Sequence, residues 1–244
     1  MERLSARSRL GIIGGTSLVE RAKGLELERH DVETPWGAPS SPLMTGNWGG
    51  AEVAVLVRHG LDHDIPPHRI NHRANVAALL AAGSRRAVLV ASVGSLRRDV
   101  SVPAVMLLSD FAGPFDVPTF FDDEIVHITP ALSEPMRRAM WEAAKREGVP
   151  VIDGGTYVQT HGPRLETRAE VRALAGWGDV VGMTLASEAT LCLERGMEVA
   201  GVCSVDNLAN GIGDRPLEFK EIMANAARNW ELIERVLRAA APAL

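Results

Sequence analysis

The chain has 244 residues and a formal net charge of −5, and its hydrophobic content of 46% and charged content of 23% are ordinary for a globular protein. The negative charge argues against broad nucleic-acid binding, because that function needs a basic surface. No apolar run approaches the roughly 20 residues that span a bilayer, and the N-terminus lacks the apolar segment of a signal peptide, so we expect a cytoplasmic protein with no membrane partner.

Apolar runs of strand length alternate with helical patterns along the chain, which favours an α/β fold class. The runs are continuous rather than alternating, as expected for strands that are covered on both faces. We find no internal repeat, linker or low-complexity segment, so residues 1–244 are predicted to form a single domain. The predicted strands span residues 10–13, 53–57, 87–91, 104–108, 179–182 and 199–205.

Other segments have helical patterns. Ser133 and Pro135 start one of them and Gly148 ends it, while the last helix carries apolar side chains along one face. Residues 109–123 form the longest irregular region, and a loop of that length in a compact domain is usually functional or interfacial. The predicted helices span residues 75–82, 133–147, 166–175 and 217–239.

Neither the cysteines nor the histidines predict a metal site. Cys192 and Cys203 both lie in apolar runs and are predicted to be buried thiols in a reducing compartment rather than a disulfide. His63, His68 and His72 lack a cysteine or carboxylate at ligand spacing, so we interpret them as positioning or surface residues.

A glycine-rich turn, Gly11-Ile-Ile-Gly-Gly-Thr-Ser17, follows the first predicted strand. Glycines let backbone amides approach an anion closely, and the hydroxyls of Thr16 and Ser17 could add donors. The alternative is a simple tight turn at the end of a strand. The sequence is neither the dinucleotide fingerprint nor the Walker pattern, which counts against a dinucleotide-dependent oxidoreductase.

Arg58 and His59 come directly after the predicted strand 53–57. Ligands of α/β sheets gather at the carboxyl ends of strands. Arginine can hold phosphate with two parallel hydrogen bonds, and histidine adds a hydrogen bond whose charge depends on pH. The alternative is a solvated surface pair.

Five polar or apolar side chains near later strand ends have both a structural and a functional interpretation. Glu166 could complement a helix dipole or read a ligand, and Asn207 could form a turn or offer a donor and an acceptor side by side. Asp206 could be a general acid or a turn residue. Met183 has the pattern of a core residue, and Thr184 that of a helix cap.

Short motifs occur in a fixed order from Gly11 to about Leu237, nearly the whole chain. They are Gly11-Ile-Ile-Gly-Gly-Thr16, Arg58-His-Gly60, Ile65-Pro-Pro-His-Arg-Ile-Asn71, Arg73-Ala-Asn75, Gly94-Ser-Leu96, Gly162-Pro-Arg-Leu-Glu166, Gly182-Met-Thr184 and Glu188. In this order they resemble the trimeric purine nucleoside phosphorylase and methylthioadenosine phosphorylase family. The resemblance implies a single domain with a mixed, mostly parallel central sheet flanked by helices.

The resemblance also implies an activity. In the family, phosphate attacks the anomeric carbon of a nucleoside and releases a purine and a pentose 1-phosphate, with inorganic phosphate as co-substrate and no cofactor or metal. A homotrimer, or a dimer of trimers, is expected, with 115–121 at or near the interface and His127 reaching the neighbouring subunit's site. The residues implied for phosphate are Thr16, Arg58, His59, the Ser92 backbone amide and Thr184. Those implied for the nucleoside are Val93, Leu165, Glu166, Met183, Asp206, Asn207 and Phe219.

Two positions indicate the base. The adenine-specific branch carries Ser where this chain has Glu166, and Asp where it has Asn207. A glutamate accepts a hydrogen bond from N1–H of a 6-oxopurine but repels the unprotonated N1 of adenine, and an asparagine can serve N7 and O6 with its two ends. An unmatched buried acceptor costs roughly 1–3 kcal/mol, so a 6-oxopurine is favoured.

Phe219 indicates the 5′ substituent. The mammalian-type nucleoside phosphorylases place a histidine near this position for the 5′-hydroxyl, whereas an apolar residue suits a 5′-methylthio group. The favoured substrate is therefore methylthioinosine, followed by inosine or guanosine. The alternatives are a methylthioadenosine phosphorylase that releases adenine and a non-catalytic nucleoside-binding protein of the same fold.

The chain departs from the family pattern in places. Family members usually carry Thr or Ser where Asp206 stands, and this extra carboxylate beside Asn207 could alter N7 protonation or admit a 6-amino group. Ala91 replaces a polar residue that is common before the phosphate-binding turn. The segments 110–116 and 207–211 also differ from the usual sequences.

Overall fold

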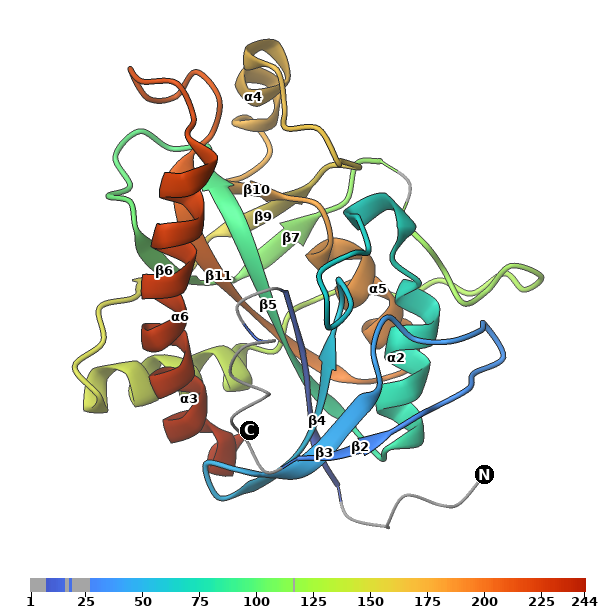
Figure 1. The fold of residues 1–244 in the computed structure, drawn as a ribbon. Coiled ribbons are helices and arrows are strands. Elements are labelled where there is room, and N and C mark those ends of the chain that lie inside the picture. The colour runs from blue at the N-terminus through green and yellow to red at the C-terminus, as the bar shows by residue number, and fades with distance from the viewer. Residues whose placement is uncertain (1–7, 16–17, 19–26, 116) are drawn as a thin grey trace.

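The computed structural model describes residues 8–15, 18, 27–115 and 117–244. A mixed sheet, with more parallel than antiparallel pairings, runs through the middle of the molecule, and helices cover both of its faces (Figure 1). The expected fold class is thereby confirmed. The strands in the described residues are β1 (Leu10–Gly14), β2 (Glu28–His30), β3 (Leu43–Trp48), β4 (Ala51–Val57), β5 (Arg86–Ser95), β6 (Ala104–Leu107), β7 (Asp110–Ala112), β8 (Ile152–Asp153), β9 (Thr156–Gln159), β10 (Val180–Gly182) and β11 (Glu198–Leu208).

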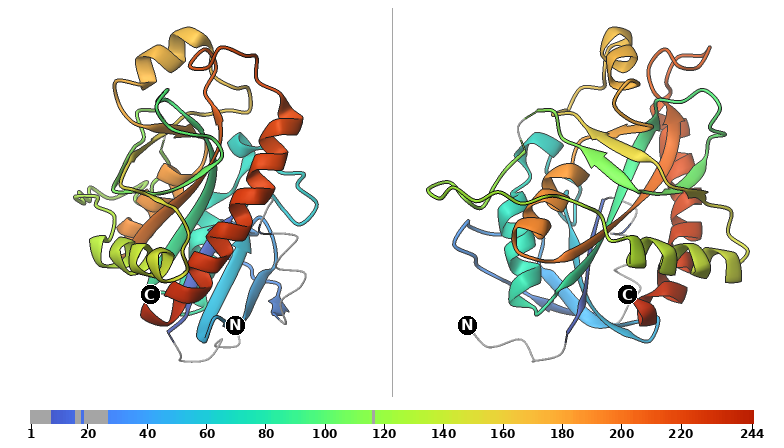
Figure 2. Two further views of the ribbon diagram at one scale, coloured as in Figure 1. Left: turned by 90° about the vertical axis from the view of Figure 1, so that its left-hand side faces the viewer. Right: turned by 180° about the vertical axis from the view of Figure 1, so that it is seen from behind.

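The helices form two layers (Figures 1 and 2). On one face, α3 and α6 pack on each other and on the sheet, and on the other face α2 packs on α5. The shorter α4 caps one end of the molecule with Val171 and Leu174. The helices are α2 (His72–Ala81), α3 (Glu134–Arg146), α4 (Arg168–Leu174), α5 (Leu185–Glu194) and α6 (Phe219–Ala240), with short 3-10 helices at Pro67–Arg69 and Ala241–Ala243.

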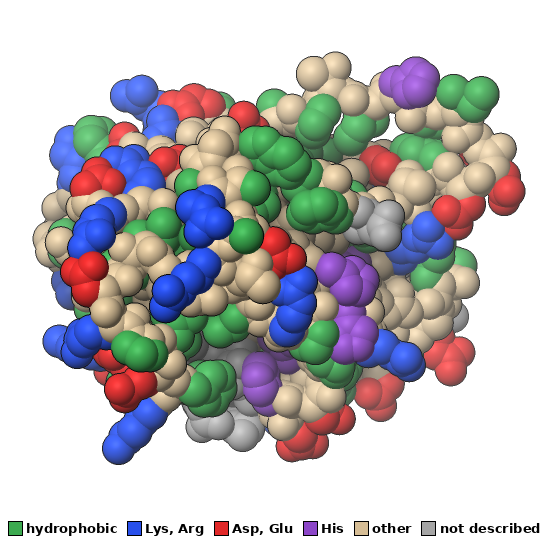
Figure 3. Space-filling model, turned by 90° about the horizontal axis from the view of Figure 1, so that it is seen from above, with side chains coloured by type: hydrophobic (Ala, Val, Ile, Leu, Met, Phe, Trp, Pro, Cys, Tyr) green, Lys and Arg blue, Asp and Glu red, His purple; other side chains and the backbone are tan. Residues whose placement is uncertain are grey.

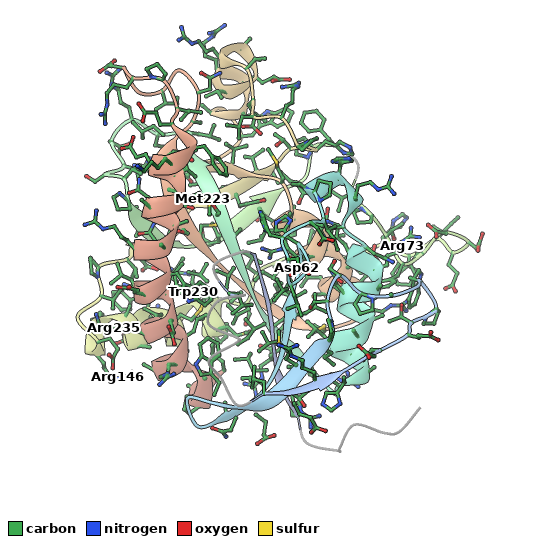
Figure 4. All side chains as sticks on the ribbon, in the orientation of Figure 1. Asp62, Arg73, Arg146, Met223, Trp230 and Arg235 are labelled. Atoms are coloured by element: carbon green, nitrogen blue, oxygen red, sulfur yellow. The ribbon has the colours of Figure 1, made fainter. Side chains whose placement is uncertain are left out.

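Continuous apolar runs form the central strands because both faces of the sheet are buried. Along β4, Val53 and Val55 contribute to the core under α3 and α6, whereas Ala54 and Leu56 contribute to the core under α2 and α5. The last helix adds one apolar stripe, including Trp230 (Figure 4). The sheet thus holds two apolar cores apart.

Polar contacts tie the helices to their neighbours. Arg146 of α3 donates to the Ala239 carbonyl over 3.5 Å, and Arg235 of α6 donates to the Glu147 carbonyl, where α3 and α6 meet (Figure 4). On the opposite face, Arg73 of α2 forms two hydrogen bonds of 2.8 and 2.7 Å with the Asp122 carboxylate. The Arg73–Asp122 pair anchors the start of the loop that follows Asp122.

At α2 and α4, side-chain caps set a helix start that differs from the sequence prediction. The Asn71 side chain accepts a hydrogen bond from the Ala74 amide, so α2 begins at His72 rather than at residue 75. Thr167 and Glu170 form a capping box, so α4 begins at Arg168. Glu166 consequently lies outside the helix, and the predicted role of its carboxylate at a helix dipole is wrong.

The sheet divides at β5, and this division positions the site. The first part of β5 pairs with β1 up to Leu89, and its end pairs with the antiparallel β10 at Gly94 and Ser95. The other edge of β5 pairs with β11 along its whole length. Residues 90–93 therefore border a gap between β1 and β10, at the carboxyl ends of the parallel strands, where ligands bind in sheets of this kind.

Candidate active site

A cavity of about 390 Å³ opens at this gap and collects residues from distant parts of the chain. Gly15 follows β1, Arg58 follows β4, Ser92 lies on β5 and Asn207 lies on β11. Figure 3 shows this end of the molecule from above, with histidine and apolar side chains beside one another around a hollow. The sequence-predicted residues that line the cavity are Arg58, His59, Ser92, Val93, Leu165, Glu166, Met183, Thr184, Asn207 and Phe219.

Three predicted residues are placed otherwise. Thr16 lies outside the described residues, although its neighbour Gly15 lines the cavity. Asp206 does not line this cavity and borders a second one, of about 500 Å³, on the far side of Asn207. His127 lies on an exposed loop away from both.

The Arg58 guanidinium is held in a fixed orientation at one end of the cavity. Its Nε and Nη2 each donate to one carboxylate oxygen of Glu188 over 2.7 Å, and Nη1 donates to the Val90 carbonyl over 2.6 Å. Both side chains are buried. Nη2 also donates to the Ile13 carbonyl over 3.3 Å. Four of the five N–H groups are thus used within the protein, so Arg58 can offer a ligand one N–H of Nη1 rather than the two-pronged grip expected from the sequence.

Burial by itself raises the pKa of Glu188, but the positive charge of Arg58 outweighs burial and lowers that pKa to about 2. Glu188 is therefore a carboxylate at neutral pH, and the charge of Arg58 is neutralised within the protein. An anion at this end would rely on aligned hydrogen-bond donors as well as on net charge.

The Ser92 backbone amide is one such donor. Alternate residues of a strand direct their amides to the same edge. The Val90 carbonyl reaches Arg58 across the gap between β1 and β10, so the Ser92 N–H is directed into that gap. The division of the sheet thus frees a backbone donor that an unbroken ladder would have used.

His59 is held by its backbone contact. Its Nδ1 lies 2.8 Å from the Ile65 carbonyl and therefore carries the hydrogen, which leaves Nε2 for a ligand. Burial and then the charge of Arg58 lower the pKa of His59 to about 4, so the ring is neutral in the unliganded protein. A bound anion would raise this pKa and favour a charged ring that donates.

The shifted pKa of His59 predicts how stability depends on pH. The unfolded state takes up a proton near pH 6.5, whereas the folded state takes it up only near pH 4. Between these values the unfolded state binds more protons, so the free energy of unfolding falls as the pH falls, by about 2–3 kcal/mol. His59→Asn keeps a donor for Ile65 but cannot be protonated, and denaturant unfolding should show a correspondingly smaller loss over this range.

Tyr157 supports the start of α5 behind the cavity residue Thr184. Its buried hydroxyl accepts hydrogen bonds from the Thr184 and Leu185 amides over 3.0 and 3.2 Å, at the start of α5. A Cβ at Gly182 would lie 2.5 Å from this hydroxyl, which explains the glycine. Thr184 is the N-cap residue of α5, as predicted, yet its side chain forms no capping bond, so the hydroxyl is available to a ligand.

The other end of the cavity carries a carboxylate and amides. Glu166 is buried, and its Oε1 accepts a hydrogen bond from the Thr160 hydroxyl over 2.5 Å. Asn210 donates to the Glu166 backbone carbonyl over 3.1 Å and links the segment after β11 to the segment before α4. Among the described residues, Oε2 of Glu166 accepts no hydrogen bond, so it can accept one from a ligand.

The Asn207 amide stands beside Gly94. Its Nδ2 donates to the Leu208 carbonyl over 2.9 Å, and a Cβ at Gly94 would lie 3.1 Å from that nitrogen. The pairing of β11 with β5 shifts register between Val205 and Asn207. This bulge directs Asn207 to the cavity and Asp206 away from it.

Asp206 is enclosed instead by side chains that donate to it. Ser92, Ser204 and Asn229 donate to its carboxylate oxygens, the last over 3.0 Å. Burial raises the pKa of Asp206, against the effect of these hydrogen bonds. Asp206 is thus next to the base-reading candidate Asn207 in sequence but lies behind the cavity wall in space.

The mouth of the cavity is apolar. Leu165 and Phe219 stand on it with exposed fractions of 53% and 76%, and Leu217 and Ile222 continue the same lining. Phe219 is the first residue of α6, so the helix fixes its backbone. A ligand with an apolar substituent at this end would cover surface that is otherwise exposed to water.

Sequence reasoning assigns no role to Glu188, Tyr157 or Asn210, which hold the site together. Glu188 is among the motifs that carry the resemblance and the other two lie near motifs, which was the one signal that could have suggested a role. In the described part of the chain, no group of three or more His, Cys, Asp or Glu side chains is placed to hold a metal ion. Cys192 and Cys203 are buried free thiols, as predicted.

A model of the phosphorylase superfamily matches residues 9–242. The chain belongs to this superfamily. It is 41% identical over 221 residues to a "Probable 6-oxopurine nucleoside phosphorylase" of Archaeoglobus fulgidus, covering 90% of each chain. It is 38% identical over 226 residues to a "Probable S-methyl-5'-thioinosine phosphorylase" of Xanthomonas campestris, covering 88% of this chain and 90% of that one.

Other relatives are named for the 6-amino nucleoside. An S-methyl-5'-thioadenosine phosphorylase of Pyrococcus abyssi is 33% identical over 239 residues, covering 96% of this chain and 92% of that one. The structure of methylthioadenosine phosphorylase from Schistosoma mansoni with adenine superposes with a TM-score of 0.89 at 25% identity, covering 97% of this chain and 92% of that one. The resemblance and the fold expected from it are therefore confirmed.

Proposed function

We propose that this superfamily member catalyses phosphorolysis of a purine nucleoside, with a 6-oxopurine as the favoured base, and acts in purine and methylthio salvage. One observation carries the proposal. A single cavity is lined by Arg58, His59 and Ser92, which suit an anion, and by Glu166 and Asn207, which suit a base. That arrangement suits an anion facing a nucleoside, with inorganic phosphate as co-substrate and no cofactor.

The two groups of residues would stabilise different parts of the transition state. As the glycosidic bond breaks, the purine gains negative charge, and a donor at N7 stabilises the transition state more than the ground state. We assign that donor to Asn207, which lines the cavity. The ribosyl group becomes cationic, and a phosphate held beside Arg58 supplies both the opposite charge and the nucleophile. Met183 and Val93 also line the cavity, and we assign them to the ribose.

The base preference follows from Glu166. Its Oε1 is already occupied by the Thr160 hydroxyl, so Oε2 is the atom left to accept from the base. N1 of a 6-oxopurine carries a hydrogen and N1 of adenine does not. Adenine in this position would place its N1 acceptor against the Oε2 acceptor of Glu166, at a cost of roughly 1–3 kcal/mol. Release of adenine from methylthioadenosine is the alternative, because relatives with that name also match the chain.

The apolar mouth favours a 5′-methylthio group, and Phe219→His tests this. We expect the ratio of kcat/KM for methylthioinosine to that for inosine to fall about tenfold, because a histidine can bond a 5′-hydroxyl and covers less apolar surface. Met223→His, one turn further along α6 and outside the cavity lining, is the control (Figure 4). A Phe219 variant with an unchanged ratio would contradict the assignment.

We further propose a homotrimer, or a dimer of trimers, in which the loop after Asp122 reaches a neighbouring site. The segment from 123 to 131 extends from the body of the molecule (Figures 1 and 2). His127 stands on it between the exposed Val126 and Ile128, and Ile125 is 92% exposed. Sedimentation equilibrium should give a multiple of three chains, and Ile125→Asp should lower it. A monomeric wild-type protein would exclude this role for His127.

The function itself is tested by following purine release from inosine and methylthioinosine with and without inorganic phosphate. We expect release only with phosphate, together with pentose 1-phosphate in equal amount. Release of free pentose in water alone would indicate a hydrolase. No release from any purine nucleoside would favour a non-catalytic nucleoside-binding protein.

A further inference from the structure

The Asp206 carboxylate is buried and accepts hydrogen bonds from three side chains. Its Oδ1 accepts from the Ser204 hydroxyl and from Asn229 Nδ2, and its Oδ2 accepts from the Ser92 hydroxyl. Its backbone carbonyl accepts from Asn225 Nδ2 over 2.8 Å, which fixes the residue from the α6 side. Asp206 therefore touches no part of the cavity directly, and its effect on a ligand must pass through another side chain.

Ser92 is that side chain. It pairs in register with Ser204 across β5 and β11, but unlike Ser204 it lines the cavity, two residues after the Val90 carbonyl that accepts from Arg58. A serine hydroxyl has one hydrogen and two acceptor lone pairs. Because the hydrogen is committed to Asp206, the Ser92 oxygen can offer only lone pairs to whatever occupies this end of the cavity.

A lone pair distinguishes oxyanions by their protonation. Hydrogen phosphate retains one P–OH group, which can donate to the Ser92 oxygen. Sulfate has no hydrogen at neutral pH, so each of its oxygens would meet that lone pair as a second acceptor. A buried acceptor that faces another acceptor costs roughly 1–3 kcal/mol, which corresponds to about a tenfold or larger difference in affinity.

We propose that Asp206 is a positioning residue that holds the Ser92 hydroxyl as an acceptor, and that this makes the anion end of the cavity selective for a protonated oxyanion over sulfate. The inference rests on the proposed function, because it takes this end to be the phosphate site. It also gives one phosphate oxygen a fixed partner, which leaves the unprotonated oxygens free to face the anomeric carbon.

Calorimetric titration of the nucleoside-free protein with phosphate and with sulfate tests this without requiring turnover. The wild type should bind phosphate at least about tenfold more tightly than sulfate. In Asp206→Asn the new amide can donate to Ser92, whose hydrogen is then free for the cavity, so the preference should largely disappear through tighter sulfate binding. Ser92→Ala removes the lone pair from the cavity and should lose the preference as well, although it also removes one hydrogen bond to Asp206.

Ser204→Ala is the matched control, because it removes an equivalent hydrogen bond to Asp206 from a residue outside the cavity lining. It should retain the wild-type preference. Equal binding of the two anions by the wild type, or an unchanged preference in Ser92→Ala, would overturn the inference. A protein that prefers phosphate but releases no purine would instead refute the proposed function and leave the selectivity standing.

Discussion

Replacing Asn207 with aspartate should shift the ratio of kcat/KM between inosine and adenosine toward adenosine by about tenfold to a hundredfold. An aspartate can only accept hydrogen bonds, so it opposes the O6 acceptor of hypoxanthine and can pair with a 6-amino group. In a buried site, exchanging a matched donor–acceptor pair for two facing acceptors changes the binding free energy of the base by roughly 1–3 kcal/mol. The measurement is steady-state phosphorolysis of both nucleosides at saturating phosphate.

Asn210→Asp is the control for the added charge. Asn210 lines the same cavity but bonds the Glu166 backbone carbonyl. Its substitution should lower kcat/KM for both nucleosides together and leave their ratio close to the wild-type value. A ratio that moves equally in both variants would show a general effect of charge and count against Asn207 as the reader of the base.

Removing Glu188 should have the largest effect on stability. Glu188→Leu leaves the Arg58 guanidinium buried without its carboxylate partner, and breaking such a pair typically costs about 3–5 kcal/mol of unfolding free energy. Denaturant unfolding at neutral pH measures the loss. The double variant Arg58→Met with Glu188→Leu should recover much of the stability but none of the phosphate binding, which separates folding from function.

The same pair predicts a pH dependence. The folded protein holds the pKa of Glu188 at about 2, below the ordinary value of 4.5. The stabilisation is therefore complete above pH 4.5 and is lost as the pH falls toward 2, because the unfolded state then binds a proton that the folded state excludes. Glu188→Leu should show a smaller loss over this range. An equal acid sensitivity of variant and wild type would argue against a tight ion pair.

The fold was predictable where burial dictates the sequence pattern. The runs around β1, β4, β5 and β11 are continuous because helices cover both faces, and each of these predicted strands is present. The helix starts were misplaced because caps at Asn71 and Thr167 override the apolar pattern that follows them. Short edge strands such as β2 carry polar residues and give no such pattern.

The cavity residues were predictable as a set, but not the contacts that orient them. The Arg58–Glu188 pair joins positions 130 residues apart, and a glutamate in a helix gives no sign that it is buried. Asp206 and Asn207 have different surroundings because the register of β11 shifts between Val205 and Asn207, and no residue type in this segment predicts that bulge. The sequence therefore predicted that Asp206 would contact the base. In the structure Asp206 does not line the cavity and is hydrogen-bonded to Ser92, which does.

In the function we propose, Glu166 and Asn207 select a 6-oxopurine in a phosphorolytic site. The most direct test is to measure kcat/KM for methylthioinosine and methylthioadenosine side by side, with phosphate saturating. We predict at least about tenfold higher efficiency with methylthioinosine, from one unmatched acceptor pair at N1. Equal efficiency, or a preference for methylthioadenosine, would contradict it.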